Sequence, residues 1–352
     1  MPAAVGTAWR YPEPLDENEA TELWAAVDRL VDRAPTVEDL FSHGLDLFAA
    51  RRWRASGRRV PAELVERERR AAVGALVVPL VFERIRSAYD GDVIPMKGPV
   101  LAARYPDPSL RAFSDLDLLV EDPAAAQAQL LAAGFEEVDD PALFGDIHHL
   151  RPLWWPGLPL GVELHSRPNW PIGLPSPPTS RILAAAVPVA DGVSMLPPAY
   201  HALLVAAHSW RHEPLRRLRD MIDVVALAEA AGRENVAALA REWDAERLWR
   251  STIRAADAAL LGAQWPAGLR LWARNLERVR ERTVFENHAT RWLSDFWIMS
   301  PRAALARLPG TLAQELSPVR GESWRAKLLR TGRAVRNASV RRSVHDGQVR
   351  RH

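Results

Sequence analysis

Two aspartates two residues apart are the residues of this sequence best suited to chemistry. Asp115 and Asp117 stand in Ser114-Asp-Leu-Asp-Leu-Leu-Val120, whose apolar residues are typical of a buried strand. Residues two apart in a strand project from the same face, so both carboxylates point the same way. Such a pair repels itself and is costly to desolvate, and a divalent cation removes that cost. An Asx-capped turn explains one aspartate more easily than two, so we predict a metal site.

A third carboxylate stands in Leu160-Gly-Val-Glu-Leu-His165, a second segment with the alternation of a strand. The alternation places Glu163 and His165 on the face opposite the apolar residues. If this strand lies beside the Asp115 strand, three carboxylates converge and offer the hard oxygen ligands that magnesium, or manganese in its place, prefers. We predict Asp115, Asp117 and Glu163 as metal ligands and catalytic residues, with Glu163 as third ligand or base. The alternative for Glu163 is a surface strand residue.

A turn earlier in the chain is the candidate for phosphate binding. Lys97 and Gly98 follow the apolar segment Val93-Ile-Pro-Met96 and precede a helical one. A glycine there lets backbone amides approach phosphate oxygens, and Lys97 adds a positive charge. Arg111 lies at the mouth of the predicted site, where it contacts phosphate or pairs with Asp107.

Several polar residues have both a functional and a structural interpretation. His165 either contacts substrate or is a hydrogen-bonded strand histidine. His208 and His212 are spaced as zinc ligands on a helix, but no cysteine or acidic partner stands at matched spacing, so zinc is not expected. His208 instead faces the nucleotide or packs within its helix. Asp220 and Asp223 are expected to pair with neighbouring arginines between helices, unless Asp223 lines the cleft.

Composition narrows the class of protein. The 352 residues include no cysteine, which excludes disulfides, iron–sulfur clusters and cysteine nucleophiles. No apolar run reaches the roughly 20 residues that cross a bilayer, and the first residues lack the pattern of a secretion signal. We therefore expect a cytoplasmic protein. Residues 320–352 hold ten of the Lys and Arg residues but two acids, against a net charge of +2 for the chain. The expected tail is solvated and flexible, with contact to nucleic acid or an acidic partner as the alternative.

Hydrophobic periodicity divides the chain into helical, mixed and helical parts. Residues 148–155 and 158–165 are expected to form a hairpin, and Pro79 to kink or start a helix. The predicted regions are an N-terminal helical region (1–89), an α/β core (90–180), a C-terminal helical region (181–318) and a basic tail (319–352).

These motifs in this order resemble the polymerase-β-type nucleotidyltransferase superfamily. More narrowly, the sequence is similar to the large bacterial nucleotidyltransferase family whose members share a Leu-Lys-Gly turn, an Arg-x-x-x-Asp-Ile-Asp-Leu-Leu-Val strand and a Glu-Leu-His strand. The resemblance spans roughly residues 75–230. The segments that carry it are Met96–Gly98, Leu110–Val120, Val162–His165, Leu203–His208 and Arg217–Asp223.

The resemblance implies an α+β fold in which a small mixed sheet bears the metal site and helical regions flank it at both ends. It implies transfer of a nucleoside monophosphate from an NTP, ATP above others, to an acceptor hydroxyl, phosphate or amine, with release of pyrophosphate. It also makes Lys97, Gly98, Arg111, His165 and His208 candidates for nucleotide binding.

Three functions are compatible with this family. The first is an enzyme acting on a small molecule or natural-product intermediate, which we favour. The second is a toxin-like modifier of protein or RNA, whose acceptor would bind the basic tail. The third is a catalytically degenerate binding module. Pro99 follows Gly98 where the superfamily usually has Gly or Ser, and its missing N–H favours the third function. The presence of all three carboxylates argues against it.

Overall fold

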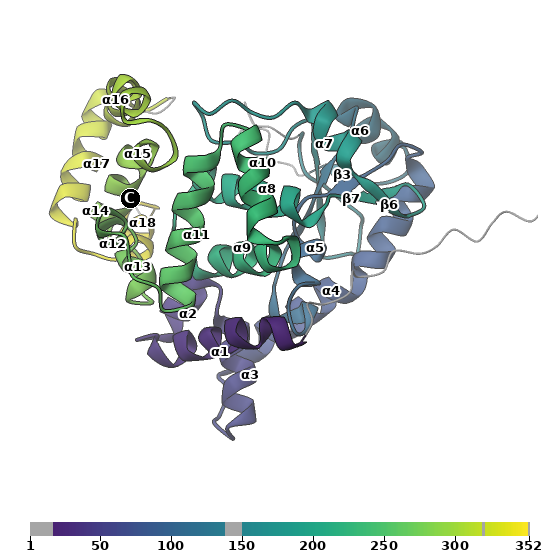
Figure 1. Ribbon diagram of the computed structural model, residues 1–352, viewed down its shortest axis with the longest axis horizontal. Helices are drawn as coiled ribbons and strands as arrows, with labels where there is room; N and C mark the ends of the chain where they lie inside the picture. The colour runs from purple at the N-terminus through teal and green to yellow at the C-terminus, as the bar shows by residue number, and fades with distance from the viewer. Residues whose placement is uncertain (1–16, 138–149, 319–320, 351–352) are drawn as a thin grey trace, which may run out of the picture.

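The computed structural model describes residues 17–137, 150–318 and 321–350, and the structural statements below concern these ranges. The fold is α+β, as predicted: a five-stranded mixed sheet packs against helices at one end of the molecule, and helices form the rest (Figure 1).

The sheet has the strand order β1-β2-β5-β4-β3. The central strands β2 and β5 are parallel. The other neighbours are antiparallel: β1 with β2, β5 with β4, and β4 with β3. The predicted hairpin corresponds to β4 and β5, although residues 148 and 149 lie outside the described ranges. A separate hairpin is formed by β6 and β7. The strands are β1 (Ile94–Pro95), β2 (Asp115–Leu119), β3 (Glu136–Glu137), β4 (Leu153–Trp154), β5 (Gly161–His165), β6 (Val187–Ala190) and β7 (Val193–Met195).

Apolar side chains of β2 and β5 form one core with the helices α4 (Ala62–Ala88) and α6 (Pro123–Ala132). Leu116 and Leu118 of β2 are fully buried in it, as their alternation with the aspartates predicts. Helix α6 begins at Pro123, where the Asp122 side chain accepts hydrogen bonds from two backbone amides of the first turn. Helix α4 runs through Pro79, so this proline does not start a helix.

A second and larger core joins the N-terminal helices to the helical layer beyond the sheet. In Figure 1, α1 to α3 lie along the lower edge and α8 to α11 in the centre. Helix α8 packs extensively against α9. These helices are α1 (Glu17–Arg33), α2 (Val37–His43), α3 (Asp46–Ala55), α8 (Pro198–His212), α9 (Leu218–Ala231), α10 (Arg233–Glu242) and α11 (Glu246–Leu260).

The C-terminal region is a further helical layer, drawn in yellow-green on the left of Figure 1. It comprises α12 (Ala267–Trp272), α13 (Arg274–Glu277), α14 (Val284–Leu293), α15 (Asp295–Ile298), α16 (Pro301–Leu316), α17 (Trp324–Arg336) and α18 (Arg342–Arg350). Short helical pieces complete the fold: α5 (Pro99–Ala102), η1 (Pro108–Leu110) and α7 (Thr179–Ala185). No helix within the described ranges is long and apolar enough to span a bilayer.

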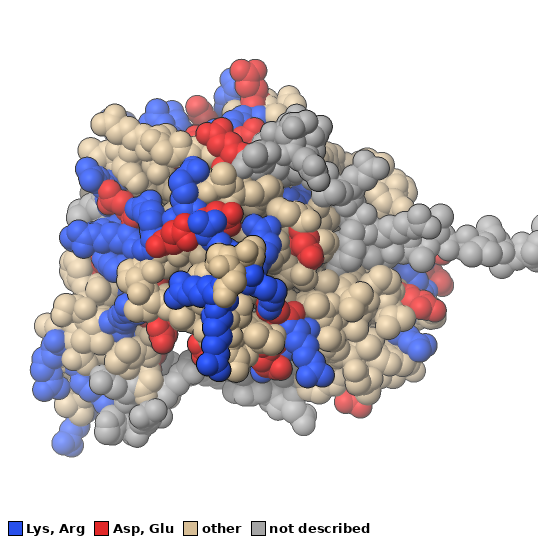
Figure 2. Space-filling view, turned by 90° about the horizontal axis from the view of Figure 1, so that it is seen from below, with Lys and Arg blue, Asp and Glu red and all other residues tan. Residues whose placement is uncertain are grey.

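The basic C-terminal segment differs from the flexible tail that its composition suggested, because α17 and α18 occupy most of it. Ion pairs tie it to the body: Arg341 contacts the buried Asp39 at 3.0 Å, and Arg342 contacts Glu213. On the face shown in Figure 2, Lys and Arg side chains lie beside Asp and Glu. Part of the basic charge of this chain is therefore used within the fold rather than offered to an acidic partner.

Candidate functional site

The parallel pairing of β2 with β5 brings the predicted carboxylates together. Its register places Asp117 directly opposite Glu163, and Asp115 opposite Gly161. Ligand atoms of Asp117, Glu163 and His165 all lie within 4.8 Å of one another. Asp115 is outside this 4.8 Å cluster, but it projects from the same face of β2 and lines the same cavities as Asp117.

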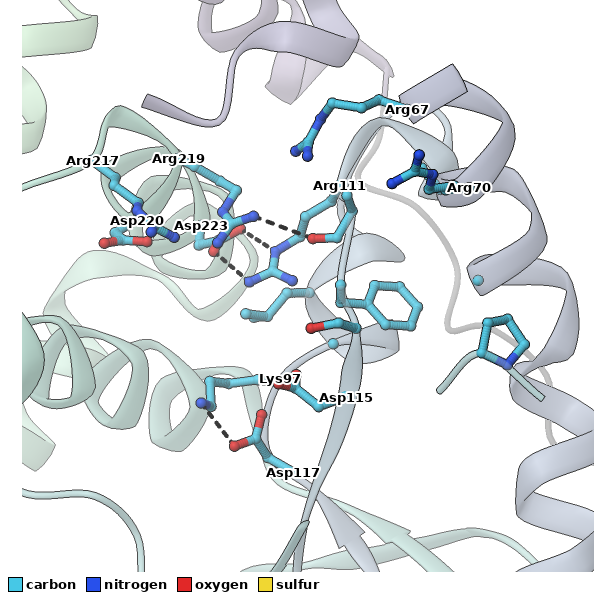
Figure 3. A pocket seen from close by; sticks show the side chains of 18 of the residues that line it. Arg67, Arg70, Lys97, Arg111, Asp115, Asp117, Arg217, Arg219, Asp220 and Asp223 are labelled. Atoms are coloured by element: carbon cyan, nitrogen blue, oxygen red, sulfur yellow. Dashed lines mark hydrogen bonds and ion pairs between the residues drawn. The ribbon is translucent and has the colours of Figure 1, made fainter. Parts of the chain in front are cut away.

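Lys97 stands beside these carboxylates because β1 pairs with β2. The backbone N–H of Met96 donates to the carbonyl oxygen of Asp117 at 2.9 Å, which fixes the chain just before the lysine. The Lys97 ammonium then lies 2.8 Å from Asp117 Oδ1 (Figure 3). It also lies 3.3 Å from His208 Nε2. Two of the predicted nucleotide-binding residues thus meet at the carboxylate cluster.

The two aspartates differ in how well their charges are compensated. Burial raises the pKa of Asp115 to about 6, and the nearby acids Asp117 and Glu163 add to this effect. Burial also acts to raise the pKa of Asp117, but Lys97 and the His165 side chain outweigh it and hold this pKa well below its ordinary value. His165 Nε2 lies 3.2 Å from Asp117 Oδ1 and 3.6 Å from Glu163 Oε2. Lys97 therefore compensates the negative charge of Asp117, whereas the negative charge of Asp115 is less well compensated.

Gly98 permits the close approach of the turn to β2. Its φ of 64° and ψ of −115° are accessible to glycine and strained for other residues. A Cβ here would lie 3.1 Å from the carbonyl oxygen of Asp115. Pro99 is the first residue of α5, where a backbone N–H has no partner within the helix. Proline therefore removes one backbone N–H donor from the turn without removing a hydrogen bond from the helix.

Arg111 forms a buried ion pair with Asp223, not with Asp107. Its Nε and Nη2 each donate to a different Asp223 oxygen at 2.8 Å, and the Tyr105 hydroxyl donates to the same carboxylate at 2.7 Å. The pairing with Asp107 was wrong because that side chain instead accepts from the Ser109 amide and caps η1. Arg111 still lines the larger cavity described below, so contact with phosphate stays a prediction.

Two histidines of α8 line the cavities of the site, His208 both and His212 the smaller. His208 Nε2 contacts Lys97, and Asn169 Nδ2 lies 3.5 Å from His208 Nδ1 and 2.5 Å from His212 Nε2. The rings of His208 and His212 are 4.4 Å apart. His208 is therefore part of the wall of the site rather than packed away from it.

Two adjacent cavities meet at the carboxylates. The larger has a volume of about 660 Å³ and the smaller about 400 Å³. Lys97, Asp115, Asp117 and His208 line both. Glu163 lines the smaller cavity and not the larger.

Each cavity also has walls of its own. Gly98, Phe113 and the α4 arginines line the larger cavity, and His212, Glu213 and Arg216 line the smaller one. The α4 arginines are Arg67, Arg69 and Arg70. Figure 3 shows Arg67 and Arg70 entering the larger cavity from α4, with Arg219 of α9 and Arg217, the residue before α9, entering across from them.

The arginines of α4 are site residues that sequence reasoning missed. Their signal was a basic cluster in the segment Glu66-Arg-Glu-Arg-Arg70. The face of α4 that meets the cavity depends on its packing against η1 and α3, which the sequence does not reveal. Arg217 and Arg219 were noticed, but only as partners of Asp220 and Asp223, and Asp223 binds Arg111 instead.

One comparison with known proteins identifies a family for this chain. A protein-family model described as an uncharacterised nucleotidyltransferase matches residues 40–260, from α2 to the end of α11. Comparisons with curated proteins and with solved structures gave no match. The matched region is more than half of the chain and contains the carboxylates, the Lys97 turn, the α4 arginines and the α8 histidines. The chain therefore belongs to this nucleotidyltransferase family.

Proposed function

We propose that this protein is a magnesium-dependent nucleotidyltransferase that moves a nucleoside monophosphate from an NTP, ATP above others, to a small-molecule acceptor in the cytoplasm. The observation that carries this proposal is the convergence of three carboxylates where two cavities meet. Membership of the nucleotidyltransferase family supports nucleotidyl transfer in general.

The carboxylates suit a hard divalent cation. Asp115, Asp117 and Glu163 offer oxygen ligands from neighbouring strands, which is the donor type that magnesium and manganese prefer. The raised pKa of Asp115 supports the same assignment, because it reports a buried carboxylate with more negative than positive charge around it. A magnesium ion bound there would neutralise charge on the phosphates of the nucleotide.

We assign the nucleotide to the larger cavity. Gly98 gives its phosphates access to the backbone of the turn, and Phe113 provides an aromatic surface in the same cavity. The arginines of α4 and Arg219 of α9 form the rim facing the carboxylates and would hold the negative oxygens of the triphosphate (Figure 3). Lys97, Arg111 and His208 line this cavity too and are proposed as further nucleotide contacts.

We assign the acceptor to the smaller cavity, because Glu163 lines that cavity alone. The acceptor oxygen or nitrogen forms a bond to the α-phosphorus, and the bond from that phosphorus to the bridging oxygen of the β-phosphate breaks. Pyrophosphate leaves, and the acceptor proton passes to the Glu163 carboxylate. Entry of the two substrates from different cavities suits the in-line geometry of phosphoryl transfer. A cavity of about 400 Å³ matches a small-molecule acceptor better than a protein or RNA surface.

Calorimetric titration of ATP, GTP, CTP and UTP with magnesium tests this proposal. We expect wild type to bind at least one nucleotide and Asp115→Asn/Asp117→Asn to lose the binding by about a hundredfold, since the bound phosphates lose their cation. Glu136→Gln is the matched control, because this acidic strand residue lies in the same sheet but outside both cavities. Absence of binding to folded wild type, or equal binding by the double variant, rejects the enzyme.

A further inference from the structure

The smaller cavity has a basic wall that the carboxylate site does not explain. This wall, formed by Arg216 and Arg217, lies in the segment between α8 and α9. Arg216 lines the smaller cavity alone, whereas Arg217 lines both. Both residues are partly buried and line the smaller cavity.

Neither arginine has a carboxylate partner of its own among the described residues. Arg217 makes no hydrogen bond or ion pair with another residue in the ranges that the structure describes, and its charge acts at longer range on Asp220, where Arg219 has the larger effect. Arg216 contacts Glu213, but the same carboxylate also receives Arg342 of α18. Arg342 has a second contact, at 3.3 Å, with the exposed end of Asp346. One carboxylate thus serves two guanidinium groups, which leaves Arg216 able to bind a further anion.

A buried arginine behind this wall increases its positive charge. Arg282 is 3% exposed, and its hydrogen bonds go to Asn275 and to the carbonyl oxygen of Pro214 rather than to an acid. Burial, together with Arg216, lowers the pKa of Arg282 to about 9. Burial, together with Arg217 and Arg342, lowers the pKa of Arg216 to about 10. Nearby Glu281 forms no ion pair with Arg216. Its carboxylate instead accepts hydrogen bonds from the backbone N–H and the hydroxyl of Ser343.

We infer that Arg216 and Arg217 bind an oxyanion of the acceptor, so that the acceptor is a small molecule bearing a phosphate or a carboxylate. This inference rests on the proposed function, because it takes the smaller cavity as the acceptor site. Planar guanidinium groups bind either oxyanion through paired hydrogen bonds. Glu163 lines the same cavity, and an acceptor anchored by its anionic end would present its hydroxyl or amine there.

Titration of inorganic phosphate and, separately, acetate into the full-length protein tests the anion site without magnesium or nucleotide. We expect Arg216→Ala and Arg217→Ala each to weaken binding by about tenfold, because each removes charged hydrogen bonds to the anion. Arg250→Ala is the matched control, since this helical arginine pairs with Glu246 and stands outside both cavities. Thermal melts check that the variants fold, and Arg216→Lys should recover part of the affinity by restoring the charge.

The outcomes separate this inference from the proposed function. Phosphate binding without acetate binding indicates that the acceptor bears a phosphate. Similar binding of both anions indicates that a carboxylate on the acceptor is sufficient for binding. Phosphate binding that depends on Arg69 and is indifferent to Arg216 and Arg217 overturns the inference, because the anion then belongs to the larger cavity. Absence of binding by either anion also overturns it. The protein could also bind the anion through Arg216 and yet bind no nucleotide in the presence of magnesium. That result supports the anion site and rejects the transferase.

Discussion

The ion pair between Arg111 and Asp223 joins the loop before β2 to α9, and its removal should destabilise the whole fold. The two side chains are 7% and 2% exposed, so substitution of either one leaves the other as an uncompensated charge in the core. Breaking one partner of such a pair costs about 3–5 kcal/mol. We expect this cost for Arg111→Met, which keeps most of the side-chain volume while removing the charge and both hydrogen bonds.

The geometry also sets the expected cost of related variants. After Arg111→Met, Asp223 keeps the hydrogen bond from the Tyr105 hydroxyl, which is too little to stabilise a buried carboxylate. Arg111→Met/Asp223→Leu removes both charges, so it should cost far less than the sum of the single variants, with a coupling of about 3 kcal/mol. Tyr105→Phe should cost about 1 kcal/mol, the net worth of one hydrogen bond.

Urea unfolding of wild type, both single variants and the double variant measures these values as a double-mutant cycle. The control is Arg250→Met, whose pair with Glu246 is exposed and 3.8 Å long and should contribute less than about 0.5 kcal/mol. If Arg111→Met costs no more than this control, or if the two single losses simply add, the pair does not hold α9 to the sheet and the argument is refuted.

Two further predictions concern stability and the turn. Burial lowers the pKa of His43 and of His201 to about 4. Because these values lie below the pKa of an unfolded histidine, their contribution to stability is full above about pH 6.5 and is lost as pH falls toward 4. Urea unfolding at pH 7 and pH 5 should show a loss of about 2 kcal/mol for each histidine, and His201→Gln should halve the difference; a pH-independent stability contradicts this. Gly98→Ala should cost about 1–3 kcal/mol and weaken nucleotide binding, since the new methyl group meets the Asp115 carbonyl. Gly57→Ala, with similar φ and no atom within 4 Å, isolates the backbone strain in the same assays; equal nucleotide affinity of the two variants would count against the turn.

The carboxylate cluster was largely predictable because a strand has a period of two. That period places Asp115 and Asp117 on one face, and Glu163 with His165 on one face of another strand. What remained conditional was whether the two strands are neighbours, since residues 120–160 separate them and pairing over that distance has no local signal. The parallel register of β2 with β5 supplies this missing step.

The arginine partners were not predictable, because they depend on which helix faces lie together. Arg111 and Asp223 are 112 residues apart in sequence, and nothing near Arg111 distinguishes Asp223 from the closer Asp107. The same limit applies to α18, where the number of basic residues suggested a solvated tail. Its Arg342 meets Glu213 because the backbone N–H of Arg342 donates to the carbonyl oxygen of Arg282, whose side chain donates to the carbonyl oxygen of Pro214 just after α8.

The stability cost of the carboxylates argues for a working site rather than a degenerate one. A scaffold gains nothing from Asp115, whose ionised form is disfavoured by burial and by the two acids beside it. Local features that oppose stability are typical of functional sites, where a ligand repays the cost on binding. Pro99 does not weigh against this, because at the first position of α5 it removes a donor that the helix does not use. The wall of the smaller cavity supports the same conclusion, because Arg216 and Arg217 place two guanidinium groups side by side near the carboxylates, and this repulsion gives the fold no stability unless an anion binds.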